Sequence, residues 1–182
     1  MLIIMSIFCI LIGLYPFIYY VIFQQEFALL PDKPDFIRNS IRWKIGFYLH
    51  IIFGGLALFM GCTQFIPKLR ATKMKLHRQL GKIYVASVFI SSIASIGIGI
   101  FATGGFIAAL GFTSLGFVWL CTTLKGYSSI IAGDVVRHRM WMIYSYSACF
   151  AGVTLRIWMP VLALLFEEFL TGYRIVAWLS WV

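Results

Sequence analysis

Two polar side chains that can do chemistry lie inside long apolar stretches of the sequence. Arg156 lies in the apolar run 148–166, and His50 lies in a second run, 46–66. A charged group inside a bilayer usually faces a protein interior or a water-filled cavity. Histidine exchanges a proton near neutral pH, and arginine can hold an oxyanion or a carbonyl. The two residues therefore predict a buried polar pocket, which either binds a quinone or small anion or serves only as a structural contact.

Two further histidines are each followed by an arginine, in the pairs His77-Arg78 and His138-Arg139. A b-type haem needs one axial nitrogen from each side, and nearby arginines can bind its propionates. We therefore predict His77 and His138 as axial metal ligands, with Arg78 and Arg139 on the propionates. The alternative is that both pairs bind lipid headgroups and so anchor the chain at the membrane interface.

The composition is that of a membrane protein. Of the 182 residues, 62% are hydrophobic and 12% are charged, against about 45–50% and about 25% in soluble domains. This length holds about five or six helices of ~20 residues and leaves no room for a separate soluble domain. We therefore expect one all-α domain over residues 1–182, a polytopic transmembrane helical bundle.

The apolar runs predict five full spans and part of a sixth. Spans two to five should form the core of the bundle, with spans one and six outside it. The sixth run is too short to cross ~30 Å of hydrocarbon at about 1.5 Å per residue. It is either a re-entrant or interfacial helix or a truncated span, and we expect truncation. The predicted spans cover residues 2–23, 45–66, 81–101, 106–124, 140–166 and, incompletely, 173–182.

The loop charges predict the orientation. Segment 67–82 carries six basic residues and no acidic one, and segment 125–139 carries three basic residues against Asp134. Because Lys and Arg collect in cytoplasmic loops, both segments and the N-terminus should lie on the cytoplasmic side. The mixed charges of segment 24–44 suit the outer side. The net charge of +9 therefore reflects topology, and we expect no nucleic-acid partner.

Three spans each carry a stripe of small and polar residues at helical spacing. Such residues share one helix face and let a neighbouring helix approach closely. His50 and Arg156 should meet in the outer half of the bundle, and His77 and His138 at the inner interface. The stripes are His50, Gly54, Ala57, Gly61 and Gln64; His77, Gly81, Tyr84, Val88, Ser91 and Ser95; and His138, Met142, Ser145, Cys149, Gly152 and Arg156.

Other chemical signatures are missing from the sequence. The four cysteines form no CxxC pair, so they should be small buried hydrophobes rather than a disulfide framework or metal site. There is no HExxH, Walker, GxSxG or dinucleotide motif. The predicted membrane interior has no Asp or Glu, which argues against a carboxylate-based cation pump or a di-iron enzyme. The sequence leaves open whether the protein is an enzyme.

These residues form a pattern that resembles a known family, an uncharacterised group of predicted bacterial inner-membrane proteins with a domain of unknown function. The resemblance covers the chain from about residue 43 to its end, and implies an inner-membrane location but no established activity. Family members continue past Trp181 with a polar tail, which supports truncation. The pattern is His50-x3-Gly54-Gly55-Leu56-Ala57-Leu58-x2-Gly61-x2-Gln64-Phe65, then His77-Arg78-x2-Gly81-x2-Tyr84, His138-Arg139-x-Trp141-Met142 and Leu155-Arg156.

These observations favour a redox-linked membrane protein that holds a b-type haem or a quinone among spans two to five. His77 and His138 would ligate the iron, and His50 with Arg156 would form an outer pocket for a quinone or lipid. The first alternative is a non-catalytic accessory subunit of a larger membrane complex, in which the same residues bind lipid or fix helix packing. The second is a small-solute carrier that binds its solute between His50 and Arg156.

Overall fold

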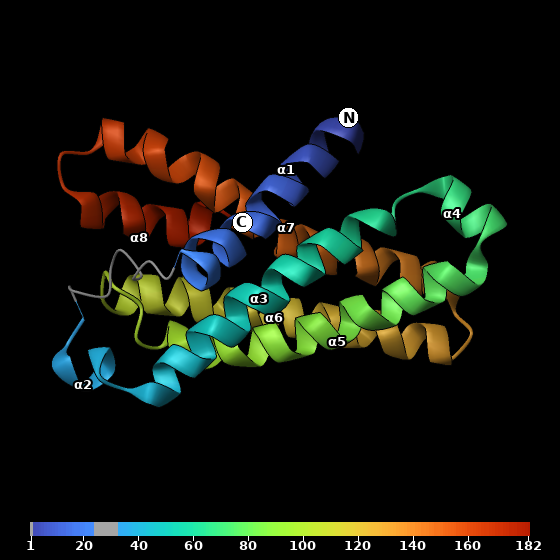
Figure 1. The fold of residues 1–182 in the computed structure, drawn as a ribbon, viewed down its shortest axis with the longest axis horizontal. Helices are drawn as coiled ribbons and strands as arrows, with labels where there is room; N and C mark the ends of the chain where they lie inside the picture. The colour runs from blue at the N-terminus through green and yellow to red at the C-terminus, as the bar shows by residue number, and fades with distance from the viewer. Residues whose placement is uncertain (1, 24–32) are drawn as a thin grey trace.

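The computed structural model describes residues 2–23 and 33–182, which contain helices and no strand. Four of these helices are long and apolar enough to cross a membrane. At about 1.5 Å per residue, each exceeds the ~30 Å of a bilayer's hydrocarbon core. These four candidate spans run side by side along the long axis of the molecule (Figure 1). They are α3 (Ile41–Thr63), α5 (Met74–Gly99), α6 (Phe106–Ile131) and α7 (Val135–Leu165).

Shorter helices lie at both ends of the chain and between the spans. The first predicted span is divided: its α-helix ends at Pro16, and a π-helix continues it. Proline lacks a backbone N–H and cannot donate the regular helical hydrogen bond, and the helix type changes directly after it. The prediction of five full spans is thus not confirmed. The shorter helices are α1 (Leu2–Pro16), the π-helix η1 (Phe17–Ile22), α2 (Asp35–Arg38), α4 (Pro67–Thr72) and α8 (Phe169–Leu179).

The four long helices form a bundle with a defined order of neighbours. Helix α3 packs on α5, α5 on α6, α6 on α7, and α7 also contacts α3. Helices α5 and α7 are therefore diagonal to each other. Both begin at the end of the bundle that holds α4 and run towards the end that holds α2 (Figure 1). Because they run in the same direction, equal steps along the two helices keep residues at the same level.

Helices α1 and α8 pack on the outside of the four long helices, and both contribute residues to the buried interior. Helix α1 packs against α3 and α7, and α8 packs against α6 and α7. The side chain of Cys9 on α1 is fully buried in the main hydrophobic cluster. On α8, Val176 and Ala177 are also fully buried. Both helices cover faces of the bundle that the long helices leave open.

The polar connections lie where the sequence predicts them, although the helices extend further than expected. Helix α5 begins at Met74 rather than near residue 81, and α6 continues to Ile131 rather than ending near residue 124. The basic segment 67–82 and the α6–α7 connection lie at the same end of the bundle, as the predicted topology requires. Of the predicted outer segment 24–44, residues 24–32 lie outside the described ranges.

The turn between α5 and α6 depends on glycine. Gly104 and Gly105 have φ angles of +97° and +77°, a region that side chains with a Cβ rarely enter. This turn lies between the predicted spans 81–101 and 106–124. At the opposite end of α6, Asp134 accepts a hydrogen bond from the backbone N–H of Arg137 at 2.9 Å and so caps α7.

Close packing of α3 against α7 depends on the small-residue stripe of α3. Gly61 lies against the ring of Tyr146, and a Cβ at this position would overlap ring atoms of both Tyr146 and Tyr84. Both tyrosines are buried. The ring of Tyr146 can therefore cross the bundle axis only because position 61 has no side chain.

We expect Gly61→Ala to destabilise the protein by about 1–3 kcal/mol, because the new methyl group overpacks the core. The measurement is the midpoint of thermal denaturation in mild detergent, followed by fluorescence-detected size exclusion. Gly97→Ala is the matched control, since a Cβ at Gly97 would meet no atom within 4 Å. Equal midpoints for the two variants would contradict the packing described for Gly61.

Candidate functional site

Three hydroxyl groups join helices α5, α6 and α7 at the centre of the bundle. The hydroxyl of Tyr84 lies 2.7 Å from Ser145 Oγ, which lies 2.6 Å from Thr123 Oγ1. Thr123 in turn donates to the carbonyl oxygen of Trp119 at 2.7 Å. All three hydroxyl-bearing side chains are buried. Buried hydroxyls need hydrogen-bond partners. These three hydroxyls, here called the hydroxyl cluster, therefore fix the position of α5 along the bundle axis relative to α7.

The hydroxyl cluster determines where two of the predicted site residues, His77 and His138, lie along the bundle axis. His77 precedes Tyr84 by seven residues, and His138 precedes Ser145 by seven residues. Seven residues are almost two helical turns, so each histidine shares a face with its hydroxyl partner, ~10.5 Å nearer the α4 end. The structure thus brings His77 and His138 to the same level on diagonal helices.

The two imidazoles differ in their hydrogen bonds. His138 Nδ1 lies 2.8 Å from the carbonyl oxygen of Gly126 on α6. Since a carbonyl only accepts, Nδ1 of His138 is the donor in this bond, and in the neutral imidazole Nε2 then carries the lone pair. This arrangement is typical of histidines that bind metal through Nε2. His77 Nδ1 is buried and has no hydrogen-bond partner among the described residues.

The ends of two flexible side chains, Gln64 and Met142, fill a layer between the hydroxyl cluster and the pair His77 and His138. Gly81, one turn from His77, lies next to the amide oxygen of Gln64. Gly126 lies next to the sulfur of Met142, one turn from His138. Both glycines give these long side chains room that a larger residue would occupy. Space in this layer can therefore be gained by side-chain rotation without moving a helix.

The donor set at this level suits only certain metals. No group of three or more His, Cys, Asp or Glu side chains that could hold a metal ion is found in the described part of the chain. A protein zinc site needs three or four such ligands. Haem iron needs only two from the protein, because the porphyrin supplies the other four. Arg78 and Arg139, the predicted propionate partners, are exposed beside this layer.

His50 is fixed by hydrogen bonds to α5. Its Nδ1 lies 3.2 Å from the carbonyl oxygen and 3.0 Å from the hydroxyl of Ser91, and that hydroxyl donates to the carbonyl oxygen of His50 at 3.0 Å. Ser91 is fully buried. These contacts orient the imidazole edge that carries Nδ1 towards α5.

Arg156 contacts a backbone carbonyl of its own helix and an aromatic ring on α1. Its Nη1 donates to the carbonyl oxygen of Gly152 at 2.7 Å, and its guanidinium carbon lies 5.7 Å from the ring centroid of Tyr15. Within residues 2–23 and 33–182, Arg156 forms no ion pair with a carboxylate. The charge is stabilised instead by a backbone carbonyl and an aromatic face. Tyr15 comes from α1, which the sequence pattern did not connect with this site.

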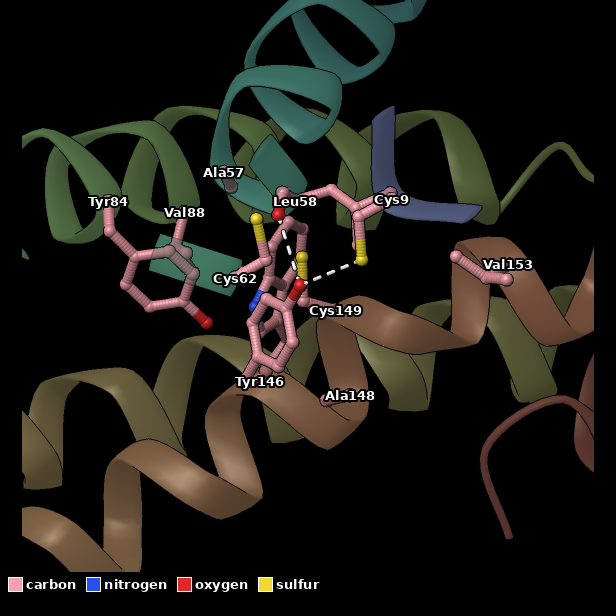
Figure 2. Packing of buried hydrophobic residues seen from close by; sticks show 11 residues of the cluster. Cys9, Ala57, Leu58, Cys62, Tyr84, Val88, Tyr146, Ala148, Cys149 and Val153 are labelled. Carbon is pink, nitrogen blue, oxygen red and sulfur yellow. Dashed lines mark hydrogen bonds between the residues drawn. The ribbon is translucent and has the colours of Figure 1, made fainter. Parts of the chain in front are cut away.

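The hydroxyl of Tyr146 lies among three thiols (Figure 2). It donates to the carbonyl oxygen of Leu58 at 3.1 Å and lies 3.0 Å from Cys9 Sγ. Cys62 and Cys149 are the other two thiols near it. All are free, and they fill space as buried hydrophobes, as predicted. Cys121 is the exception to that prediction, because it is exposed on the outer face of α6.

The chain was compared with known families and proteins. A family model described as "Predicted membrane protein (DUF2306)" matches residues 47–182. This range contains His50, His77, His138 and Arg156. No curated protein and no solved structure matches the chain.

We expect Ser145→Ala to lower the free energy of unfolding by about 1–3 kcal/mol, because it leaves two buried hydroxyls short of a partner. Denaturation in mild detergent measures the effect. Ser147→Ala is the control on the same helix, since the Ser147 hydroxyl is exposed and bonds only within its own helix, to Ile143. The control should change stability by no more than about 0.5 kcal/mol. If Ser145→Ala also changed the free energy of unfolding by no more than about 0.5 kcal/mol, the hydroxyl cluster would not fix the bundle.

Proposed function

The chain belongs to the DUF2306 family of predicted membrane proteins, and we propose that it is a redox-linked integral membrane protein that holds a b-type haem between His77 and His138. One observation carries this proposal: Tyr84 and Ser145 are hydrogen-bonded, and His77 and His138 lie seven residues before them on helices that run in the same direction (Figure 1). Equal steps from this bond set the two histidines at one level. Bis-histidine ligation needs this geometry, with one nitrogen approaching the iron from each side.

The hydrogen bond of His138 supports the same ligation. The bond from its Nδ1 to Gly126 would leave Nε2 available to ligate the iron. A porphyrin would occupy the layer that the ends of Gln64 and Met142 now fill, next to Gly81 and Gly126. Haem bound in this layer supplies an iron that accepts and gives up one electron at a time. The protein would set its potential through the axial imidazoles and the apolar surroundings.

The position of the layer near one end of the bundle fits the charges of haem. The propionates are anionic and must reach the interface, where Arg78 and Arg139 are exposed. We place this end on the cytoplasmic side of a bacterial inner membrane, because segment 67–82 carries six basic residues and no acidic one.

The pocket of His50 and Arg156 is the proposed site for a quinone headgroup. A quinone carbonyl accepts hydrogen bonds, and the guanidinium of Arg156 offers donors that no carboxylate in the described ranges occupies. His50 is held in place by Ser91 and can exchange a proton as the quinone is reduced. Tyr15 would cover the headgroup with an aromatic face.

Two other functions use the same residues without redox chemistry. In an accessory subunit of a larger membrane complex, His77 and His138 would bind lipid headgroups at the interface. In a small-solute carrier, Arg156 and His50 would bind the solute. The part-buried guanidinium of Arg156 has no carboxylate partner in the described ranges. It favours a ligand-binding role over a purely structural one, because packing alone needs no charge.

We expect the protein, purified in mild detergent from haem-supplied cells, to show Soret and α bands in a reduced-minus-oxidised spectrum. His77→Ala and His138→Ala should each lose these bands, because one imidazole cannot hold a six-coordinate b-type haem. His50→Ala is the control and should keep them. Absence of bands from the folded unaltered protein would remove haem and leave the accessory-subunit and carrier functions.

We expect a quinone to co-purify with the unaltered protein and to be detected by mass spectrometry of the organic extract. Arg156→Gln should reduce it by at least about tenfold, since a hydrogen bond to a charged group contributes about 1.5–3 kcal/mol. His138→Ala should lose haem and keep the quinone, which separates the two sites. Equal quinone in the unaltered protein and Arg156→Gln would contradict the assignment of this pocket.

A further inference from the structure

A second polar site lies at the α2 end of the bundle, away from the paired histidines. A cavity of about 640 Å³ opens where the residues before α2, the α5–α6 turn and the start of α8 meet. Its lining includes two cationic side chains, Lys33 and Arg174, and no Asp or Glu among the described residues. Both charged side chains of the described lining are therefore positive.

Lys33 is held in the cavity wall by the polypeptide around it. Its side chain is only 7% exposed. The ammonium group donates to the carbonyl oxygen of Phe101 at 2.5 Å, lies 3.5 Å from Thr103 Oγ1, and sits 5.1 Å from the ring centroid of Trp43. Burial lowers the pKa of Lys33. An anion in the cavity would stabilise the charged form that burial disfavours.

Arg174 and the start of α6 add to the positive potential. Arg174 donates through Nε to the carbonyl oxygen of Gly104 at 2.9 Å, which leaves the outer guanidinium nitrogens for other acceptors. Gly105, immediately before α6, lines the cavity, and this helix start has no side-chain cap bonded to its backbone. The start of α8 does not add to this potential, because Glu167 and Glu168 directly precede it. Free N–H groups at helix N-termini attract phosphates and other anions.

An apolar groove adjoins the charged cavity. It has a volume of about 490 Å³ and shares Phe101 with the cavity as a wall. Trp43, which lies under the ammonium of Lys33, is part of its lining, together with Ile93 and Ile98. A cationic cavity that continues into an apolar groove fits a molecule with an anionic head and a hydrocarbon chain.

We propose that this cavity binds a phosphate group through Lys33, Arg174 and the N-terminus of α6, and that the groove takes an acyl chain when the phosphate belongs to a phospholipid. This site shares no residue with the proposed haem and quinone sites. It stands or falls independently of them.

The test is binding of phosphatidylglycerol to the delipidated full chain, measured by native mass spectrometry in detergent. Lys33→Gln combined with Arg174→Gln should weaken binding by at least about tenfold, because two charge-assisted contacts are lost. Lys33→Arg, which keeps the charge, should retain binding. If the double variant does not fold, Arg174→Gln alone serves, with an expected loss of at least about threefold.

A matched control removes two other cations from the same end of the molecule. Arg38 and Lys44 are exposed and line neither the cavity nor the groove. Arg38→Gln combined with Lys44→Gln should therefore bind phosphatidylglycerol as the unaltered chain does. An equal loss in this control would show that binding follows net charge alone and would overturn the proposal.

Further arms identify the source of the phosphate. Diacylglycerol, which lacks the phosphate, should bind the unaltered chain and the cavity variant equally. Inorganic phosphate is tested by the rise in denaturation midpoint that it produces. If only phosphatidylglycerol distinguishes the cavity variant, the ligand is a phospholipid; if inorganic phosphate does so, the ligand is a soluble phosphate. If neither distinguishes it from the unaltered chain, the proposal is wrong.

Discussion

The arrangement of the bundle depends on the buried hydroxyl cluster, in which Ser145 is hydrogen-bonded to both Tyr84 and Thr123. Apolar surfaces pack without strong directional preference, so they allow two helices to slide against each other at little cost. Hydrogen bonds of 2.6–2.7 Å between three helices do not. They fix the level of α5 against α7, and this level brings His77 and His138 opposite each other.

Small residues make these polar contacts possible. The ring of Tyr146 crosses the bundle and reaches Leu58 and Cys9 only because Gly61 leaves it room. Inside a membrane, helix association depends on close packing and interhelical hydrogen bonds, since lipid is as apolar as the side chains. The glycine and serine positions of the stripes therefore serve structure, whereas His50 and Arg156 are the polar positions to which we assign the proposed ligand pocket.

The residues to which we assign ligand sites lie in three separate places. His77 and His138 lie near the starts of α5 and α7, and Lys33 with Arg174 lines the cavity at the α2 end. Arg156 contacts Tyr15 of α1, and His50 bonds to Ser91 of α5. Only exposed ion pairs occur among the residues with described structure. The buried cations are stabilised by carbonyl oxygens and aromatic rings instead. This leaves their remaining donors for anionic or carbonyl-bearing ligands.

The sequence by itself determined the all-helical class, four of the spans, the turn at Gly104 and the helix faces that carry the histidines. These features follow from local hydropathy and from a periodicity that repeats every turn. The sequence did not determine how α1 packs or that Arg156 contacts Tyr15. Nor did it determine that Thr123 joins the hydroxyl cluster or that Lys33 and Arg174 line one cavity. Each of these joins residues far apart in the chain, and only the packing of whole helices against one another brings such residues together.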